Sequence, residues 1–144
     1  MKNILCFGDS NTWGYIPGTF DPDAFLFERY DFSKRWPGIL QNGLGNDYRI
    51  IENGLGGRTT DIDDPTRPDK NGLTQISFAL QIASPVDLVI LMLGVNDFKT
   101  MFNRTATDVV QGISNIIDVI EATKFVKGSH TKILIIAPPP IIDK

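Results

Sequence analysis

Residues 3–12 read NILCFGDSNT, a short apolar run followed by small and polar residues. The apolar part, residues 3–7, is continuous rather than alternating, which is typical of a β-strand buried on both faces. The polar part is a turn in which Ser10 follows the strand closely. A serine at a strand-to-helix turn presents its hydroxyl to solvent, as a nucleophile requires, but for Ser10 taken alone a helix cap is the better interpretation.

The same strand signal recurs along the chain and alternates with helical periodicity. Continuous apolar runs at residues 87–93 and 132–137 predict two more strands buried on both faces, and residues 48–52 predict a weaker fourth strand. Helical patterns that end near a glycine or proline fill the intervals, at residues 36–44, 74–82 and 106–122. The order β-α-β-α-β-α-β predicts an α/β fold with three layers, in which helices cover both faces of a flavodoxin-like, doubly wound parallel sheet.

In such a sheet, ligands bind outside the carboxyl ends of the strands, so the loops that follow the strands are the candidate site. The loop after residue 52 contains Gly57, and the loop after residue 93 contains Asn96. A glycine lets the backbone approach closely enough for its N–H to face an oxyanion, and an asparagine side chain is a further neutral donor. Each residue alone is typical of any turn, but their occurrence with Ser10 in successive loops at one edge favours a nucleophile with two oxyanion donors.

Four segments resemble sequence blocks of the SGNH or GDSL hydrolases, and more closely the arylesterase and acyltransferase branch of that family. They read ILCFGDS at residues 4–10, GLGGRTTDIDDPT at residues 54–66, LMLGVND at residues 91–97 and PPP at residues 138–140. The resemblance implies the SGNH hydrolase fold and an esterase in which Ser10 is the nucleophile. It also implies that Gly57 gives a backbone N–H, and Asn96 its side-chain amide, to the oxyanion. Asn11 stands where the GDSL name has leucine, at a position that does no chemistry.

The family's fourth block, an Asp-x-x-His motif with the catalytic histidine, does not occur in residues 1–144. The only histidine, His130, precedes the strand predicted at residues 132–137, so we expect it at the amino edge of the sheet, on the order of 20 Å from the edge that carries Ser10. A general base must reach the proton that it takes, so His130 is expected to be a surface or helix-end residue. We therefore expect residues 1–144 to be one domain that is incomplete at its carboxyl end and lacks the last strand and helix, together with the catalytic aspartate and histidine.

Residues 12–35 form the longest segment without periodicity and are rich in aromatic residues. Long loops inside compact domains tend to be functional or disordered, and aromatic rings argue against disorder. The rings either wall an acyl pocket, form a subunit contact or simply hold the loop on the domain surface. We expect Trp13 and Asp9 to bind substrate, although an Asx hydrogen bond that orients the turn is the stronger interpretation of Asp9.

The loop after residue 52 also contains charged residues. Asp61, Asp63 and Asp64 form an acidic cluster, but the prolines beside them and the lack of a calcium-loop pattern favour a solvated loop over a metal site. Arg58 either binds an acidic group or packs across a loop junction. We expect neither a metal nor a cofactor.

Composition and charge disfavour several classes of protein. The chain has 144 residues, 42% of them hydrophobic and 22% charged, which suits one globular domain. Its net charge of −3 is scattered, so nucleic acid is not an expected partner. No apolar stretch is long enough for a signal peptide or a membrane span, and a single cysteine, Cys6, is consistent with a cytoplasmic location.

The leading hypothesis is a serine esterase that hydrolyses or transfers the acyl groups of small carboxylic esters through an acyl-Ser10 intermediate. The alternative is a non-catalytic module on the same fold that binds a small acyl or sugar ligand. A nucleotide-binding domain is disfavoured because the first loop lacks a glycine-rich phosphate-binding pattern. The expected partners are a small ester and either a second copy of the chain, as a homo-oligomer, or a complementary C-terminal fragment.

Overall fold

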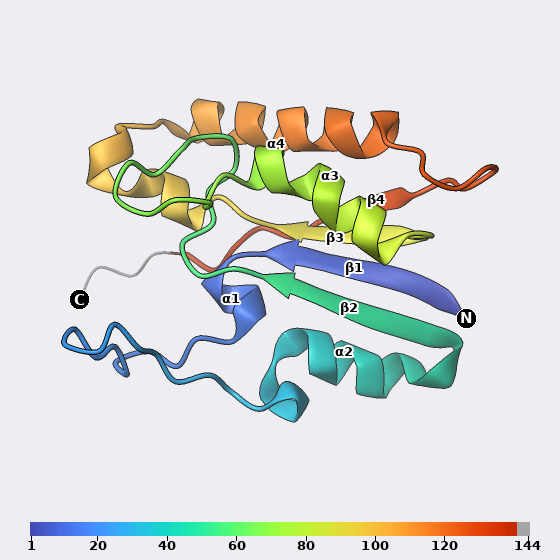
Figure 1. The fold of residues 1–144 in the computed structure, drawn as a ribbon, viewed down its shortest axis with the longest axis horizontal. Helices are drawn as coiled ribbons and strands as arrows, with labels where there is room; N and C mark the ends of the chain where they lie inside the picture. The colour runs from blue at the N-terminus through green and yellow to red at the C-terminus, as the bar shows by residue number, and fades with distance from the viewer. Residues whose placement is uncertain (141–144) are drawn as a thin grey trace.

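The computed structural model describes residues 1–140, and a parallel sheet lies at its centre (Figure 1). The strands of this sheet are β1 (Lys2–Gly8), β2 (Tyr48–Gly54), β3 (Leu88–Met92) and β4 (Lys132–Ile135), in the spatial order β2-β1-β3-β4. Gly8 at the end of β1 lies opposite Gly54 of β2 and Met92 of β3. The carboxyl ends of these strands are therefore level, and the loops that follow them meet at one edge of the sheet.

The longest helices cover the two faces of the sheet. α2 (Trp36–Leu44) packs on one face, whereas α3 (Gly72–Ala83) and α4 (Ala106–Ala122) pack on the other (Figure 1). Shorter helices lie in the connecting segments, namely α1 (Ser10–Trp13), η1 (Phe32–Lys34), η2 (Gly45–Asp47), η3 (Val95–Phe98) and η4 (Thr100–Phe102). The predicted order of strands and helices and the predicted three-layer, doubly wound fold are confirmed.

The core explains why β1 is apolar at consecutive positions. Leu5 and Phe7 belong to the core cluster under α3 and α4, whereas Ile4 and Cys6 belong to the cluster under α2. Because both faces of β1 are covered, no position between Ile4 and Phe7 suits a polar residue, and each large side chain buried there contributes about 1.5–3 kcal/mol. Burial also raises the pKa of the Cys6 thiol to about 12, so Cys6 is a buried, protonated thiol.

Local capping signals set the helix boundaries. α4 begins with a capping box, in which the Thr105 side chain accepts from the Asp108 N–H and the Asp108 carboxylate accepts from the Thr105 N–H. α2 ends at Gly45, whose φ of 71° suits a residue without a side chain. α3 begins two residues before the predicted start because the Asn71 side chain accepts from the Leu73 N–H and caps the helix there.

The prediction that residues 132–137 are buried on both faces is wrong. β4 lies at the edge of the sheet, and in the part of the chain that the structure describes only β3 pairs with it. Ile133 packs against the core, but Leu134 is 48% exposed and Ile135 is 52% exposed. A continuous apolar run indicates what a strand prefers to contact, but the covering layers over β4 do not reach these two side chains.

A long irregular segment, residues 14–31, extends beside the carboxyl edge of the sheet (Figure 1). Isolated bridges between Tyr15 and Arg29 and between Asp21 and Leu26 fold this segment back on itself. Aromatic rings cluster along it, with Phe20 stacked on Phe27 at 4.9 Å between ring centroids. The rings thus hold the segment in a defined shape, although several of them remain exposed. Among the residues described, no helix has the length and apolarity needed to cross a membrane.

Candidate active site

Ser10 is the first residue of α1 and follows directly on the turn that ends β1. The turn is fixed by Asp9, whose Oδ1 accepts a hydrogen bond of 2.9 Å from the Asn11 N–H. Ser10 is half-buried, and within residues 1–140 its hydroxyl has no hydrogen-bond partner. A serine hydroxyl held at the start of a helix and unpaired is available to a substrate.

Asp9 lies behind Ser10 and does not line the cavity that Ser10 faces. It is fully buried, and its Oδ2 atom has no hydrogen-bond partner among the described residues. Burial raises the pKa of Asp9, while the hydrogen bonds from Asn11 and the charge of Arg58 oppose that rise. The geometry therefore matches the Asx hydrogen bond that orients the turn, and it offers Asp9 no contact with a ligand in the cavity.

Gly57 lies in the loop between β2 and α3 with a φ of 81°, a region that favours glycine. Its backbone N–H has no acceptor within the described part of the chain. A Cβ atom at this position would come within 2.9 Å of Nη1 of Arg67, so the loop also passes close to that guanidinium. Glycine is required here by the backbone conformation, and the free N–H remains available to a ligand.

Asn96 lies in η3, just after β3, and its side chain connects two loops. Its Nδ2 donates a hydrogen bond of 3.0 Å to the Arg58 carbonyl oxygen. A side-chain amide has two N–H bonds, so the bond to Arg58 orients the amide and leaves one N–H for another acceptor. Asn96 thus has both a structural contact and a spare donor.

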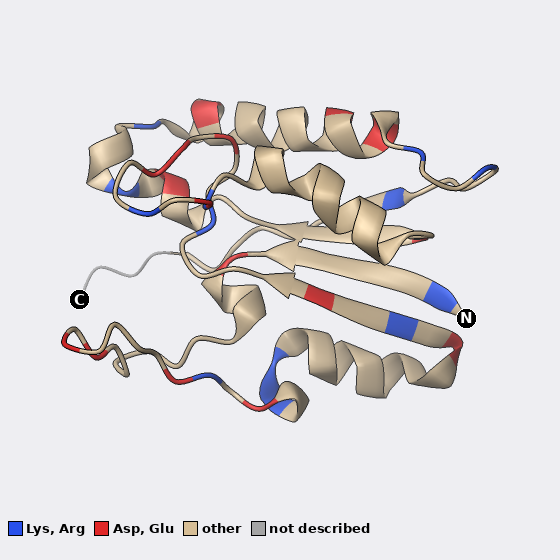
Figure 2. Cartoon of the chain, viewed as in Figure 1, with Lys and Arg blue, Asp and Glu red and all other residues tan. Residues whose placement is uncertain are grey.

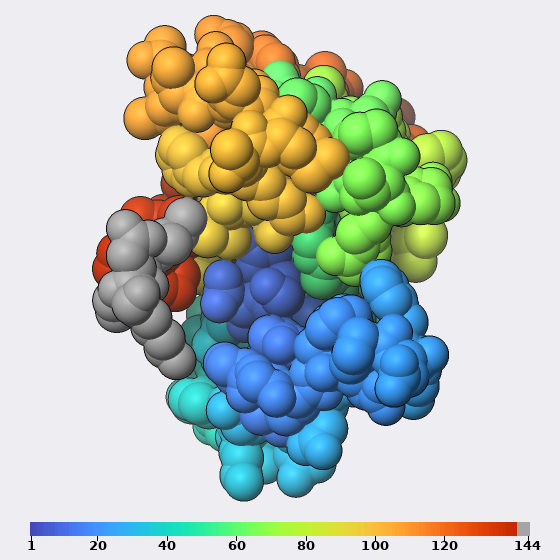
Figure 3. Space-filling model, turned by 90° about the vertical axis from the view of Figure 1, so that its left-hand side faces the viewer, coloured from blue at the N-terminus to red at the C-terminus, as the bar shows by residue number. Residues whose placement is uncertain are grey.

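The three residues predicted to act on the substrate line one cavity. Ser10, Gly57 and Asn96 all border a space of about 360 Å³, the size of a small-molecule site. Figure 3 shows the face of the molecule onto which the carboxyl ends of the strands open, where the blue residues after β1 form the floor of a hollow. The light-blue segment 14–31 and the green loop between β2 and α3 lie on different sides of that hollow (Figure 3).

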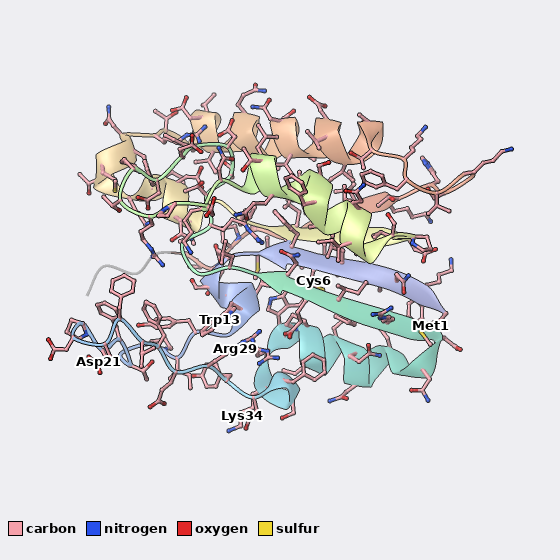
Figure 4. The ribbon with its side chains drawn as sticks, viewed as in Figure 1. Met1, Cys6, Trp13, Asp21, Arg29 and Lys34 are labelled. Carbon is pink, nitrogen blue, oxygen red and sulfur yellow. The ribbon has the colours of Figure 1, made fainter. Side chains whose placement is uncertain are left out.

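Trp13, predicted to bind substrate, also borders the cavity, together with Tyr15 and Phe27 of the irregular segment. Arg29 lies 4.8 Å from the centre of the Trp13 ring, and its Nε donates to the Trp13 carbonyl oxygen (Figure 4). The same segment also contacts the sheet, since Arg35 after it forms an ion pair of 2.7 Å with Glu52. One wall of the cavity is therefore aromatic and anchored at its two ends.

Of the two interpretations of Arg58, the structure supports packing across a loop junction. Arg58 is buried and is not exposed to a ligand. Its guanidinium donates to the Gly8 and Asn53 carbonyl oxygens at 2.8 Å and 2.6 Å. It also lies 4.0 Å from the centre of the Phe7 ring. Burial lowers the pKa of Arg58 to about 10, and Asp9 opposes that shift. Arg58 therefore joins the ends of β1 and β2 beneath the cavity.

The interpretation of the acidic cluster as a solvated loop is wrong for two of its three residues. Asp64 is buried and forms an ion pair of 3.0 Å with Lys99, and hydrogen bonds from Thr66 lower the pKa of Asp64 to about 2. Asp61 pairs with Arg104, and only Asp63 is exposed. Among the described residues, no three Asp, Glu, His or Cys side chains come together in a way that could hold a metal ion.

A buried network behind the site was not found from the sequence. Asp97 is fully buried and accepts hydrogen bonds from the Thr60 backbone N–H at 3.0 Å and from Arg104 Nη1 at 3.1 Å. Burial raises the pKa of Asp97, while the hydrogen bonds from Thr60 and the charge of Arg104 act in the opposite direction. No local spacing reveals this network, because its members come from three separate segments of the chain.

His130 is exposed in the segment between α4 and β4, at the amino end of β4. That end of the sheet is opposite the edge that carries α1 and Ser10 (Figure 1). The expected separation of His130 from Ser10 is confirmed, so His130 is not the base for this serine.

Comparisons with known proteins agree with the fold and with the loops described above. The sequence model of the GDSL-like lipase/acylhydrolase family matches residues 6–144. A solved aryl esterase from M. smegmatis is 42% identical, with a TM-score of 0.89, and the alignment covers 97% of this chain and 65% of that one. A carbohydrate acetylesterase from Sinorhizobium meliloti is 39% identical, with a TM-score of 0.88 and the same coverage of both chains.

A lipase/acylhydrolase from Enterococcus faecalis is more distant, at 25% identity and a TM-score of 0.60, with 97% of this chain and 58% of that chain covered. Curated protein sequences gave no match. The chain belongs to the GDSL-like lipase/acylhydrolase family. It spans less than two thirds of the length of the solved structures named here.

Proposed function

We propose that the protein is a serine esterase that acts on small carboxylic esters through an acyl-Ser10 intermediate. The observation that carries the proposal is the shared cavity: a half-buried serine hydroxyl, the backbone of Gly57 and the Asn96 amide border the same space. Related solved structures are an aryl esterase and a carbohydrate acetylesterase, which agrees with ester cleavage as the reaction class.

In the proposed mechanism, Ser10 Oγ attacks the ester carbonyl carbon and gives up its proton to a base. The carbonyl oxygen becomes an oxyanion, which accepts hydrogen bonds from the Gly57 and Ser10 backbone N–H groups and from the free N–H of Asn96. The C–O bond to the alcohol then breaks, and the alcohol leaves with the proton. Water, or a second alcohol in acyl transfer, gives a proton to the base and attacks the acyl carbon. The bond from that carbon to Ser10 Oγ then breaks, the acid or the new ester leaves, and Oγ takes the proton back.

The base belongs, in this proposal, to a part of the polypeptide other than residues 1–140. Within those residues the Ser10 hydroxyl has no partner, and the only histidine of the sequence lies at the opposite end of the sheet. Activity is therefore to be measured on the natural full-length polypeptide.

The test is the Ser10→Ala variant, assayed with p-nitrophenyl acetate. We expect kcat to fall by several orders of magnitude, as for other serine nucleophiles. Ser114→Ala, an exposed serine on α4, is the matched control and should retain the wild-type rate. A phenylmethylsulfonyl adduct on Ser10, detected by mass spectrometry, should form in the wild type and be absent from Ser10→Ala.

The second candidate function is a non-catalytic module that binds a small ligand in the same cavity. It predicts equal, background rates for the wild type and Ser10→Ala, with no adduct on Ser10. That outcome would remove Ser10 as the nucleophile and leave binding as the function of the cavity.

A further inference from the structure

Two cationic side chains, Arg67 and Lys70, border the cavity that contains Ser10. Both come from the loop between β2 and α3, residues 55–71, which carries charges of both signs (Figure 2). Among residues 1–140, no acidic side chain lines the cavity. The cavity therefore has a positive side, in addition to the aromatic wall formed by Trp13, Tyr15 and Phe27.

Neither cation is neutralised by the part of the protein that the structure describes. Arg67 and Lys70 form no ion pair there, whereas other cations close to the site do, such as Lys99 with Asp64 and Arg104 with Asp97. The acidic residues of the same loop are occupied elsewhere, since Asp64 binds Lys99. Both cations are thus only partly exposed, and neither has an ion-pair partner among residues 1–140.

The surroundings of Lys70 disfavour its charged form. Partial burial lowers the pKa of Lys70, and the nearby charges of Arg67 and Arg58 lower it further, while the charge of Asp64 acts in the opposite direction. A negatively charged group bound between Arg67 and Lys70 would relieve that repulsion, because opposite charges favour the charged form of each.

The position of Arg67 brings this charge close to the reacting atoms. A Cβ atom built on Gly57 would lie 2.9 Å from Nη1 and 3.3 Å from the central carbon of the Arg67 guanidinium. The guanidinium therefore packs on the backbone of the residue that offers an N–H to the oxyanion. An ester held at Ser10 would have one of its substituents within reach of Arg67.

We propose that the cavity selects esters that carry a carboxylate, with the apolar part of the substrate on Trp13, Tyr15 and Phe27 and the carboxylate on Arg67 and Lys70. The proposal rests on the proposed esterase function of the same site. A guanidinium binds a carboxylate through two parallel hydrogen bonds, which gives orientation as well as energy, and an ammonium adds a second charge.

The experiment compares each carboxylate-bearing ester with its neutral methyl ester, using the natural full-length polypeptide. In the first pair the charge is on the acyl side: mono-p-nitrophenyl glutarate against its methyl ester, which releases the same p-nitrophenol. In the second pair it is on the alcohol side: para-acetoxybenzoate against its methyl ester. For each pair, the ratio of kcat/KM for the anionic ester to that for the neutral ester is the measured selectivity.

The test variant is Arg67→Met/Lys70→Met, and the matched control is Lys2→Met/Arg49→Met. The control removes the same two charges from exposed positions at the amino ends of β1 and β2. We expect the selectivity of at least one pair to fall about tenfold or more in the test variant, mainly through KM, because a hydrogen-bonded charge pair is lost. In the control it should stay at the wild-type value. The wild-type selectivity should also shrink as sodium chloride is raised.

Selectivity that is unchanged in both pairs would overturn the proposal and leave the esterase function standing. If the wild type hydrolyses no ester, the esterase function is removed. The carboxylate site is then tested by a direct binding measurement. In the Ser10→Ala background, Kd for the anionic ester is measured by tryptophan fluorescence, with and without Arg67→Met/Lys70→Met. A tenfold weaker Kd supports the carboxylate site, and an equal Kd overturns it.

Discussion

Asn96 donates to two different acceptors in the proposed mechanism, and a single substitution separates them. Asn96→Ala should lower kcat by roughly a hundredfold to a thousandfold while changing KM much less, because the amide faces charge that develops only in the transition state. It should also lower the free energy of unfolding by about 1 kcal/mol, because the hydrogen bond to the Arg58 carbonyl is lost. Steady-state kinetics and urea unfolding on the same preparation measure the two effects. A wild-type kcat with only the loss of stability would make Asn96 a purely structural residue.

The residues that could be predicted from the sequence share one property: each comes within four residues of the end of a strand. Ser10, Gly57 and Asn96 occupy turns whose position is fixed by the apolar runs before them, so the sheet alone brings them to one edge. Arg67 and Lys70 could not be predicted as cavity residues, because they lie ten or more residues after β2 in a loop without periodicity. Where such a loop returns to the cavity depends on distant contacts such as Asp64 with Lys99.

At the scale of elements, Arg104 connects the loop after β2, the helix η3 and the start of α4. It pairs with Asp61 and Asp97, and its Nη2 donates to the Asp108 carbonyl oxygen at 2.7 Å. Asp97 is buried, so it depends on Arg104 and Thr60 for compensation of its charge. The segments that carry Gly57 and Asn96 are thereby fixed relative to each other.

Replacing this cation should destabilise the protein strongly. Arg104→Met should lower the free energy of unfolding by about 2–4 kcal/mol, because removal of one partner leaves a buried charge uncompensated. The pKa of Asp97, already raised by burial, should rise further because the Arg104 charge that lowers it is gone, so protonation of Asp97 relieves more of the loss as the pH falls. The loss relative to wild type should therefore be smaller at pH 5 than at pH 8. Arg49→Met is the control, and a loss that does not depend on pH would show that Asp97 is not the group involved.

The ends of helices could be predicted where the capping residues are close in sequence. The extent to which other elements cover a strand could not be predicted. The bounds of α2 and α4 match the predicted ranges because Gly45 and the Thr105–Asp108 capping box lie at their ends. The apolar run of β4 predicts burial on both faces, but Leu134 and Ile135 are exposed because the layers over a strand come from elements far away in the sequence.

For the whole molecule, the apolar edge at β4 has a consequence for association. Leu134, Ile135 and Ile136 are exposed beside a strand edge that has no partner among the described residues, an arrangement that favours pairing between chains. A polypeptide of residues 1–144 should therefore self-associate at micromolar concentration. Ile135→Lys should reduce the association, whereas Val110→Lys, at an exposed position on α4, should not. Sedimentation velocity distinguishes the outcomes, and a monomeric wild-type polypeptide would contradict the expectation.

The walls of the cavity differ in how they are attached to the sheet. Ser10, Gly57 and Asn96 lie just after strands of the sheet. Tyr15 and Phe27 belong instead to a segment that folds mostly on itself and is joined to the rest near its ends. A substitution at Tyr15 or Phe27 is accordingly expected to change the aromatic wall with less effect on the reacting groups than a substitution at a strand end. The aromatic contacts of a substrate and the reacting groups are therefore encoded in separate stretches of the sequence, whereas the cations Arg67 and Lys70 share a loop with Gly57.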